Sequence, residues 1–142
     1  MGRSKSDPPS IPREGPAAGT VKILLVDDEV GYLRVLANRL RKRKFDVSEA
    51  SGGAEGLRAL RQKTFDVAVL DLKMEDMDGI EVLKIFKKMD PNMQVIMLTG
   101  HGSEEAARQG IALGAFSYLT KPCELDELLE KIKQATGSRT AT

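Results

Sequence analysis

Five short apolar runs alternate with amphipathic helical patterns along most of this chain, and this alternation constrains the fold more than any other feature. The runs span residues 21–26, 45–50, 67–70, 95–98 and 115–119. Runs this short do not suit helices, whereas apolar runs of this kind are typical of strands buried on both faces of a parallel sheet. We therefore predict five strands.

A helical pattern follows each predicted strand. The patterns span approximately residues 30–40, 53–62, 80–86, 103–113 and 125–132. The last is the clearest, because Leu125, Leu128, Leu129 and Ile132 recur at the i, i+3, i+4 and i+7 spacing of one helical face. Ser103 is in a position to cap the fourth helix with its side chain.

Strands that alternate with helices in this way predict an α/β fold, in which helices cover both faces of a parallel sheet. We expect the folded domain to span residues 21–136. Residues 1–20 hold four of the six prolines and show no apolar periodicity, which predicts a flexible tail, and residues 137–142 form a short polar tail. Ligands of such folds bind beyond the carboxyl ends of the strands, so the residues there are the candidates for function.

The composition excludes several classes of protein. The chain is 41% hydrophobic and 30% charged, which is typical of globular proteins. Its longest purely aliphatic run is residues 23–26, too short to span a membrane, and the sequence shows no apolar core of a signal peptide. The single cysteine cannot form an intrachain disulfide. We expect a cytoplasmic protein with no membrane partner.

The charge gives no sign of a nucleic-acid-binding surface. The 22 basic and 21 acidic residues leave a net charge of +1, whereas DNA-binding domains carry a strong basic excess on one face. The one dense basic run, residues 39–44, falls at the end of a predicted helix, where cations are favoured by the helix dipole. Direct nucleic-acid binding is therefore not predicted.

Acidic residues follow two of the predicted strands. Asp27 and Asp28 come after the first strand, and Asp71 comes after the third. Parallel pairing gathers these ends into one cleft, where close carboxylates repel one another by up to about 4 kcal/mol per pair at an effective dielectric near 20. A cation is needed to compensate this repulsion, and oxygen ligands of this kind suit Mg²⁺.

Two further strand ends supply groups that suit an anion. Thr99 ends the fourth strand and brings a hydroxyl donor, and Lys121 follows the fifth strand with a fixed positive charge. A carboxylate nucleophile, a metal, a cationic group and a hydroxyl donor are the parts of a phosphoryl-transfer site. Each residue alone has a simpler explanation, such as a helix cap or a surface charge, but their joint occurrence favours this chemistry.

The order and spacing of these residues resemble the receiver domain of two-component response regulators, the CheY-like family. The resemblance covers about residues 21–136 and rests on Val26-Asp27-Asp28-Glu29, Leu70-Asp71-Leu72-Lys73-Met74, Met77-Asp78-Gly79, Leu98-Thr99-Gly100 and Tyr118-Leu119-Thr120-Lys121-Pro122. Residues 95–122 are most similar to receivers of sigma-54-type activators. The resemblance implies a doubly wound, flavodoxin-like (βα)5 three-layer sandwich, with a five-stranded parallel sheet in the order 2-1-3-4-5.

The resemblance also implies the roles of individual residues. Asp71 would accept a phosphoryl group from the phosphohistidine of a sensor histidine kinase. Asp28, Asp71 and the backbone carbonyl of Lys73 would bind Mg²⁺, and Asp27 would act through a metal-bound water. Lys121 would contact the phosphoryl group. The domain would be a signalling domain, not an enzyme beyond its own phosphorylation and slow dephosphorylation.

The same resemblance implies a switch. Thr99 would hydrogen-bond the phosphoryl group and Tyr118 would rotate in response, which changes the surface of the fourth helix, fifth strand and fifth helix. Gly110 lowers the helix propensity of the fourth helix by about 1 kcal/mol relative to alanine, so we expect that helix to shift easily. An output domain or downstream protein, or a phosphorylation-dependent homodimer, would use this surface.

The resemblance has further implications at three places, and the sequence departs from the family at one. Lys73 and His101 would modulate water access to the phosphoryl group, and the Lys121–Pro122 peptide bond would be cis. Glu75 is a departure, because the family often has proline four residues after the phosphoacceptor. This difference alters the loop and adds negative charge.

Two alternatives share some of these features. A metal-dependent phosphohydrolase with an aspartyl nucleophile would use strand-end carboxylates, but such enzymes carry an Asp-x-Asp motif after the first strand and a cap domain. Here Asp27 and Asp28 are adjacent, and the chain has no residues to spare for a cap. A receiver that binds partners without phosphorylation usually lacks an acidic, Thr or Lys member of the site, and all are present here. The phosphorylation-controlled switch is the better prediction.

Overall fold

The computed structural model describes residues 19–100 and 102–137, which hold five strands and five helices in strict alternation. The strands are β1 (Lys22–Val26), β2 (Asp46–Ala50), β3 (Val67–Asp71), β4 (Gln94–Thr99) and β5 (Ser117–Thr120). The helices are α1 (Val30–Lys42), α2 (Gly53–Gln62), α3 (Gly79–Met89), α4 (Glu104–Ala112) and α5 (Leu125–Ala135). Most of the predicted tail at 1–20, His101 and residues 138–142 of the predicted C-terminal tail lie outside the described residues.

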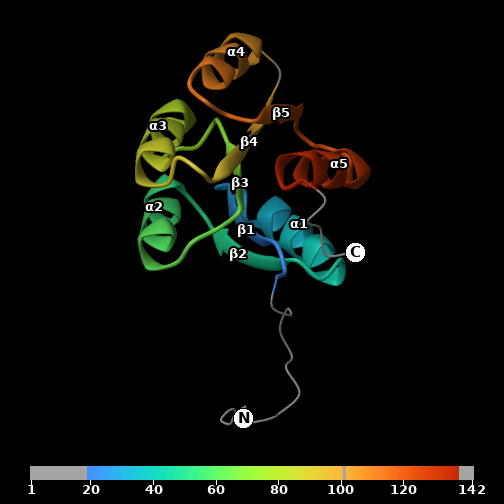
Figure 1. Cartoon of the computed structure of the whole chain (residues 1–142). Helices are drawn as coiled ribbons and strands as arrows, with labels where there is room; N and C mark the ends of the chain where they lie inside the picture. Colours follow the sequence, from blue (N-terminus) through green and yellow to red (C-terminus); the bar gives the residue numbers. More distant parts are fainter. Residues whose placement is uncertain (1–18, 101, 138–142) are drawn as a thin grey trace, which may run out of the picture.

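The strands form one parallel sheet in the order β2-β1-β3-β4-β5 (Figure 1). All five residues of β3 are buried, as expected for a central strand covered on both faces. The predicted strand order and the flavodoxin-like α/β fold are therefore confirmed.

Two layers of helices enclose the sheet. Helices α1 and α5 pack on one face through Leu33, Leu40, Leu128 and Ile132. Helices α2 and α3 cover the other face, where Phe86 is fully buried, and Ala106 of α4 packs against the same core. Among the described residues, no helix is both long and apolar enough to cross a membrane.

Helix α4 differs from the sequence prediction at its amino-terminal cap. Ser103 occupies its N-cap position, but the side chain makes no capping hydrogen bond, so this part of the prediction is wrong. The backbone N–H of Ser103 donates to the Gly100 carbonyl, which places the residue in a turn and not in the extended conformation typical of a side-chain cap. Gly110 is buried where α4 crosses β4, and a Cβ atom there would collide with the Met97 sulfur. This glycine therefore allows close packing.

Strand β5 begins later than the predicted run at 115–119. The N–H of Ala115 donates to the Gly110 carbonyl at 3.0 Å, a hydrogen bond that closes the turn after α4, so Ala115 is not part of the strand. The strand proper runs from Ser117 to Thr120, and Thr120 lies beside Thr99 of β4. This register places the carboxyl ends of β4 and β5 at the same edge of the sheet.

Candidate functional site

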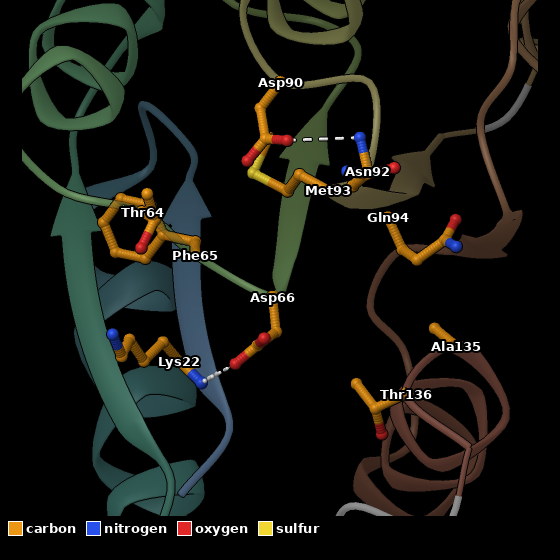
Figure 2. Close-up of a pocket in the computed structure, with 10 residues that line it drawn as sticks. All are labelled: Lys22, Thr64, Phe65, Asp66, Asp90, Asn92, Met93, Gln94, Ala135 and Thr136. Atoms are coloured by element: carbon orange, nitrogen blue, oxygen red, sulfur yellow. Dashed lines mark hydrogen bonds between the residues drawn. The ribbon is translucent and has the colours of Figure 1, made fainter. Parts of the chain in front are cut away.

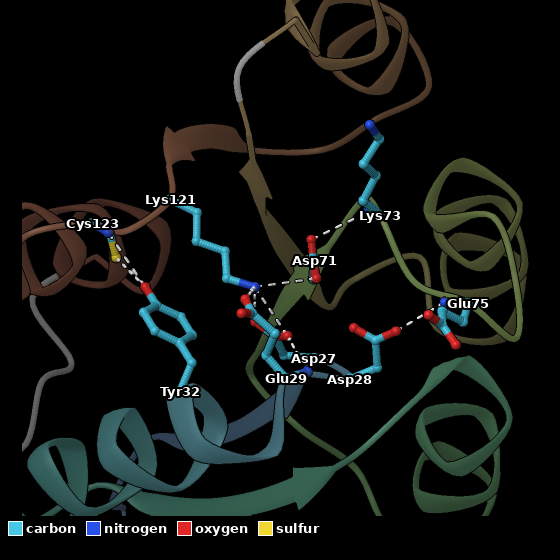
Figure 3. A network of polar contacts seen from close by, with 9 residues as sticks. All are labelled: Asp27, Asp28, Glu29, Tyr32, Asp71, Lys73, Glu75, Lys121 and Cys123. Atoms are coloured by element: carbon cyan, nitrogen blue, oxygen red, sulfur yellow. Dashed lines mark hydrogen bonds and ion pairs between the residues drawn. The ribbon is translucent and has the colours of Figure 1, made fainter.

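Three carboxylates meet at the carboxyl edge of the sheet. Asp27 directly follows β1, Asp28 comes next, and Asp71 is the last residue of the neighbouring strand β3. One oxygen from each lies within 4.8 Å of the others (Figure 3). Asp27 and Asp71 are buried, whereas Asp28 is partly exposed. The strand topology thus gathers the acidic residues that the sequence analysis singled out.

Lys121 reaches this cluster from the segment after β5. Its Nζ lies 2.9 Å from Asp27 Oδ2 and 3.4 Å from Asp71 Oδ2, and it also pairs with Glu29. Burial lowers the pKa of Lys121, but the hydrogen bonds to Asp27 and Glu29 outweigh this effect and raise the pKa above its ordinary value. The lysine therefore keeps its positive charge at neutral pH.

Asp71 is held between two donors. Its Oδ1 accepts a 3.1 Å hydrogen bond from the backbone N–H of Lys73, and its Oδ2 faces Lys121. Burial raises the pKa of Asp71 to about 6, and the charge of Asp27 acts in the same direction. The Lys73 N–H and Lys121 oppose this shift without cancelling it.

This raised pKa predicts a pH dependence of stability in metal-free buffer. The ordinary pKa of the group is 3.8, so between about pH 4 and 6 the native state binds more protons than the unfolded state. The free energy of unfolding should fall as the pH rises through this range, by up to about 3 kcal/mol for a shift of this size. Urea denaturation at several pH values, with a chelator present, measures this change in the free energy of unfolding.

Asp71→Asn is the matched variant for this prediction, because asparagine has the same shape and does not titrate. The variant should equal the wild type near pH 4 and become more stable than it near pH 7. Curves that stay parallel across this range would show that Asp71 does not titrate in this way.

The donor set fits a magnesium ion. Asp27 Oδ2 is a buried atom that makes no hydrogen bond of good geometry, although Lys121 Nζ lies within ion-pair distance. Three carboxylates supply hard oxygen donors at one place, which is the ligand type that Mg²⁺ takes. One lysine cannot balance the charge of this cluster and Glu29 together.

The remaining predicted residues lie around this cluster. Thr99 is buried at the end of β4, and its hydroxyl donates to the Leu119 carbonyl at 3.4 Å. The Lys73 side chain is exposed and extends away from Asp71 (Figure 3). Tyr118 is 44% exposed, and the Lys121–Pro122 peptide bond is cis. His101 lies outside the described residues.

Tyr32 contacts Cys123 and Lys121, which was not predicted from the sequence. Its hydroxyl accepts a 3.3 Å hydrogen bond from the backbone N–H of Cys123, and its ring lies 4.9 Å from Lys121 Nζ. Burial, assisted by the side-chain hydrogen bond with Cys123, raises the pKa of Tyr32 to about 12, so the phenol stays protonated. The only sequence signal was its place one helical turn after Asp28, since its partner lies 91 residues away.

A hollow of about 480 Å³ lies at the opposite edge of the sheet from the carboxylate cluster (Figure 2). Lys22, Asp66 and Gln94 at the amino-terminal ends of three strands contribute to it. None of the predicted site residues that the structure describes lines this hollow, so we assign the chemistry to the carboxyl edge.

Comparison with known proteins agrees with the geometry of this edge. The family model described as the response regulator receiver domain matches residues 23–133. The chain belongs to the response regulator receiver family. This receiver therefore shares the standard role of its family, a phosphorylation-controlled switch in two-component signalling.

Three similar proteins illustrate the relationship. The transcriptional regulatory protein GlrR of Escherichia coli is 42% identical over 113 residues, which are 80% of this chain and 26% of GlrR. The sporulation initiation phosphotransferase F of Bacillus subtilis is 35% identical over 80% of this chain and 91% of that protein. A CheY-like receiver structure from Methanospirillum hungatei has a TM-score of 0.80 at 34% identity, covering 84% of this chain and 96% of that one. The receiver thus spans about a quarter of the length of GlrR.

Proposed function

We propose that Asp71 of this receiver accepts a phosphoryl group from the phosphohistidine of a sensor histidine kinase in a Mg²⁺-dependent reaction. The observation that carries this proposal is the buried Asp71 carboxylate, which faces Lys121 and lies beside Asp27 and Asp28 at the carboxyl edge of the sheet. Membership of the receiver family supports it. The domain, for which we keep the bounds 21–136, would catalyse only its own phosphorylation and slow dephosphorylation.

The chemistry is a single displacement at phosphorus. An oxygen of the Asp71 carboxylate forms the new P–O bond while the P–N bond to the donor imidazole breaks, and the electron pair of that bond stays with the imidazole. Mg²⁺, held by Asp27 (through a bound water), Asp28, Asp71 and the Lys73 carbonyl, would neutralise charge on the phosphoryl oxygens. Lys121 supplies a fixed ammonium already directed at the Asp71 carboxylate.

The output would run through Thr99 and Tyr118. The Thr99 hydroxyl donates to the Leu119 carbonyl of β5, so a move toward the phosphoryl group breaks a contact between β4 and β5. Tyr118, two residues from the register partner of Thr99, lies exposed and is free to change its orientation. Lys73 and His101 would modulate the access of water.

The surface that would change is apolar. Its exposed apolar side chains, from α4, β5 and the segment that joins them, are Ile111, Leu113, Phe116 and Tyr118. Such side chains suit contact with a partner or a second copy of the receiver. We propose an output domain or downstream protein, or a phosphorylation-dependent homodimer, as the occupant of this surface, and the cytoplasm as the site of action.

Beryllofluoride, which mimics a phosphoryl group on an aspartate, tests the switch. We expect its addition with Mg²⁺ to change amide NMR shifts from Gly100 to Cys123, because a bias at Thr99 is passed to β5 and α4. An Asp71→Asn sample should show no change. If the wild type responds only beside Asp27, Asp28 and Asp71, the chain binds phosphoryl groups without switching.

A further inference from the structure

The loop between β3 and α3 is closed on itself. The N–H of Gly79 donates to the Leu72 carbonyl at 3.2 Å, and Lys73 and Asp78 form an isolated bridge across the loop. A Cβ atom on Gly79 would collide with the Leu72 backbone, so glycine is needed for this close approach. The closure projects residues 74–77 toward α2 and the segment after β1.

Asp76, in the projected part of the loop, is anchored to the first turn of α2. Its two carboxylate oxygens accept hydrogen bonds from the N–H groups of Gly53 and Ala54, each at 3.0 Å. Both donors are unpaired within the helix itself, because they lie at its amino terminus. A Cβ atom on Gly52 would lie 3.0 Å from Asp76 Oδ2, so the glycine leaves the room that the carboxylate takes. The loop and the helix are therefore fitted to each other.

Glu75, next to this anchor, contacts the acidic cluster through its backbone. Its N–H donates a 2.9 Å hydrogen bond to Asp28 Oδ2. Figure 3 shows the other Asp28 oxygen on the side of Asp27. Hydrogen bonds of this kind orient metal-binding carboxylates, and their loss typically lowers metal affinity 10- to 100-fold.

We propose that Glu75 and Asp76 are positioning residues for the magnesium site: Asp76 fastens the loop to α2, and the Glu75 N–H then holds the Asp28 carboxylate with one oxygen available to the metal. This inference rests on the proposed function, because it takes Asp28 as a ligand. It also assigns a role to the departure at Glu75, since a proline at this position has no N–H to donate.

Two variants of Glu75 distinguish the contribution of its backbone N–H from that of its side chain. Glu75→Ala removes the carboxylate and keeps the N–H, whereas Glu75→Pro removes both. We expect Mg²⁺ titration calorimetry, without any phosphodonor, to show Glu75→Ala within about threefold of the wild type and Glu75→Pro about tenfold weaker than Glu75→Ala.

A second pair of variants tests whether Asp76 acts by anchoring the loop or only through its negative charge. Asp76 and Glu55 both line a hollow of about 470 Å³ beside Asp28, and both carboxylates bind at the start of α2. Glu55, however, holds Ser51 and not the loop. Asp76→Ala should therefore weaken Mg²⁺ binding about three- to tenfold more than Glu55→Ala, and equal losses would mean that only the charge matters.

The hydrogen bond from the Glu75 N–H to Asp28 can be measured without any metal. In metal-free samples, Asp28→Ala should shift the Glu75 amide resonance upfield and speed its hydrogen exchange, because the acceptor is gone. An unchanged Glu75 amide would overturn the proposal even if Glu75→Pro failed to fold.

The outcomes also distinguish this inference from the proposed function. If Asp28→Ala binds Mg²⁺ as tightly as the wild type, the metal assignment fails. If Asp28→Ala loses binding while Glu75→Pro and Glu75→Ala bind equally, the assignment stands and the positioning role is wrong.

Discussion

Asp71→Asn is expected to take up no phosphoryl group from acetyl phosphate under conditions in which the wild type gains one. The amide cannot act as the nucleophile, because its oxygen carries no negative charge and its addition product would lose the resonance of the amide. The neighbouring carboxylates offer no substitute in the proposed site, because Asp28 and, through a bound water, Asp27 would hold the metal, and Asp28 also accepts from the Glu75 N–H.

Intact-mass spectrometry measures this loss directly. Asp90→Asn is a matched control, since it makes the same chemical change at the opposite edge of the sheet, where the Asp90 carboxylate accepts a hydrogen bond from the Asn92 N–H in its own turn. That variant should be labelled like the wild type, and a chelator should abolish labelling of both. Equal labelling of Asp71→Asn would show that another residue is the acceptor.

Magnesium is expected to raise the free energy of unfolding by about 2.7 kcal/mol at a concentration of one hundred times its dissociation constant. The ion relieves repulsion among three carboxylates that share one place in the native state, whereas the unfolded chain has no such site. For a domain of this size the corresponding rise in Tm is roughly 10 °C. Thermal and urea unfolding with and without Mg²⁺ measure the effect.

Asp28→Ala should lose most of this gain and keep the fold. Asp28 is partly exposed, so its removal leaves no cavity in the core, and the freed Glu75 N–H is exposed enough to bind water. Asp27 is a poorer choice, because its loss would leave the partly buried Lys121 short of a partner. If Asp28→Ala gains as much stability from Mg²⁺ as the wild type, the ion binds elsewhere.

Sequence patterns predicted most of the fold because the determinants of the elements are local. The apolar run of β3 and the periodicity of α5 place the ends of both elements within three residues of their observed positions. Predictions from local sequence were wrong where the backbone forms a turn that the sequence pattern did not indicate. Ser103 is a good capping residue by type, but it lies in a turn that directs its N–H to Gly100, and the start of β5 was displaced because the Ala115 N–H closes α4.

The meeting of Asp27, Asp28, Asp71, Thr99 and Lys121 at one edge was also predictable, since parallel strands bring their carboxyl ends together whatever the details of packing. What the sequence by itself determined is therefore the α/β fold and the kind of residue at each strand end. Only the tertiary structure decided which side chains touch. Tyr32 lies under Lys121, Glu29 pairs with the same lysine, and Asp76 fastens the loop to α2. These contacts join segments far apart in the chain, and their distances depend on helix packing and loop closure, which leave no periodic signal in the sequence.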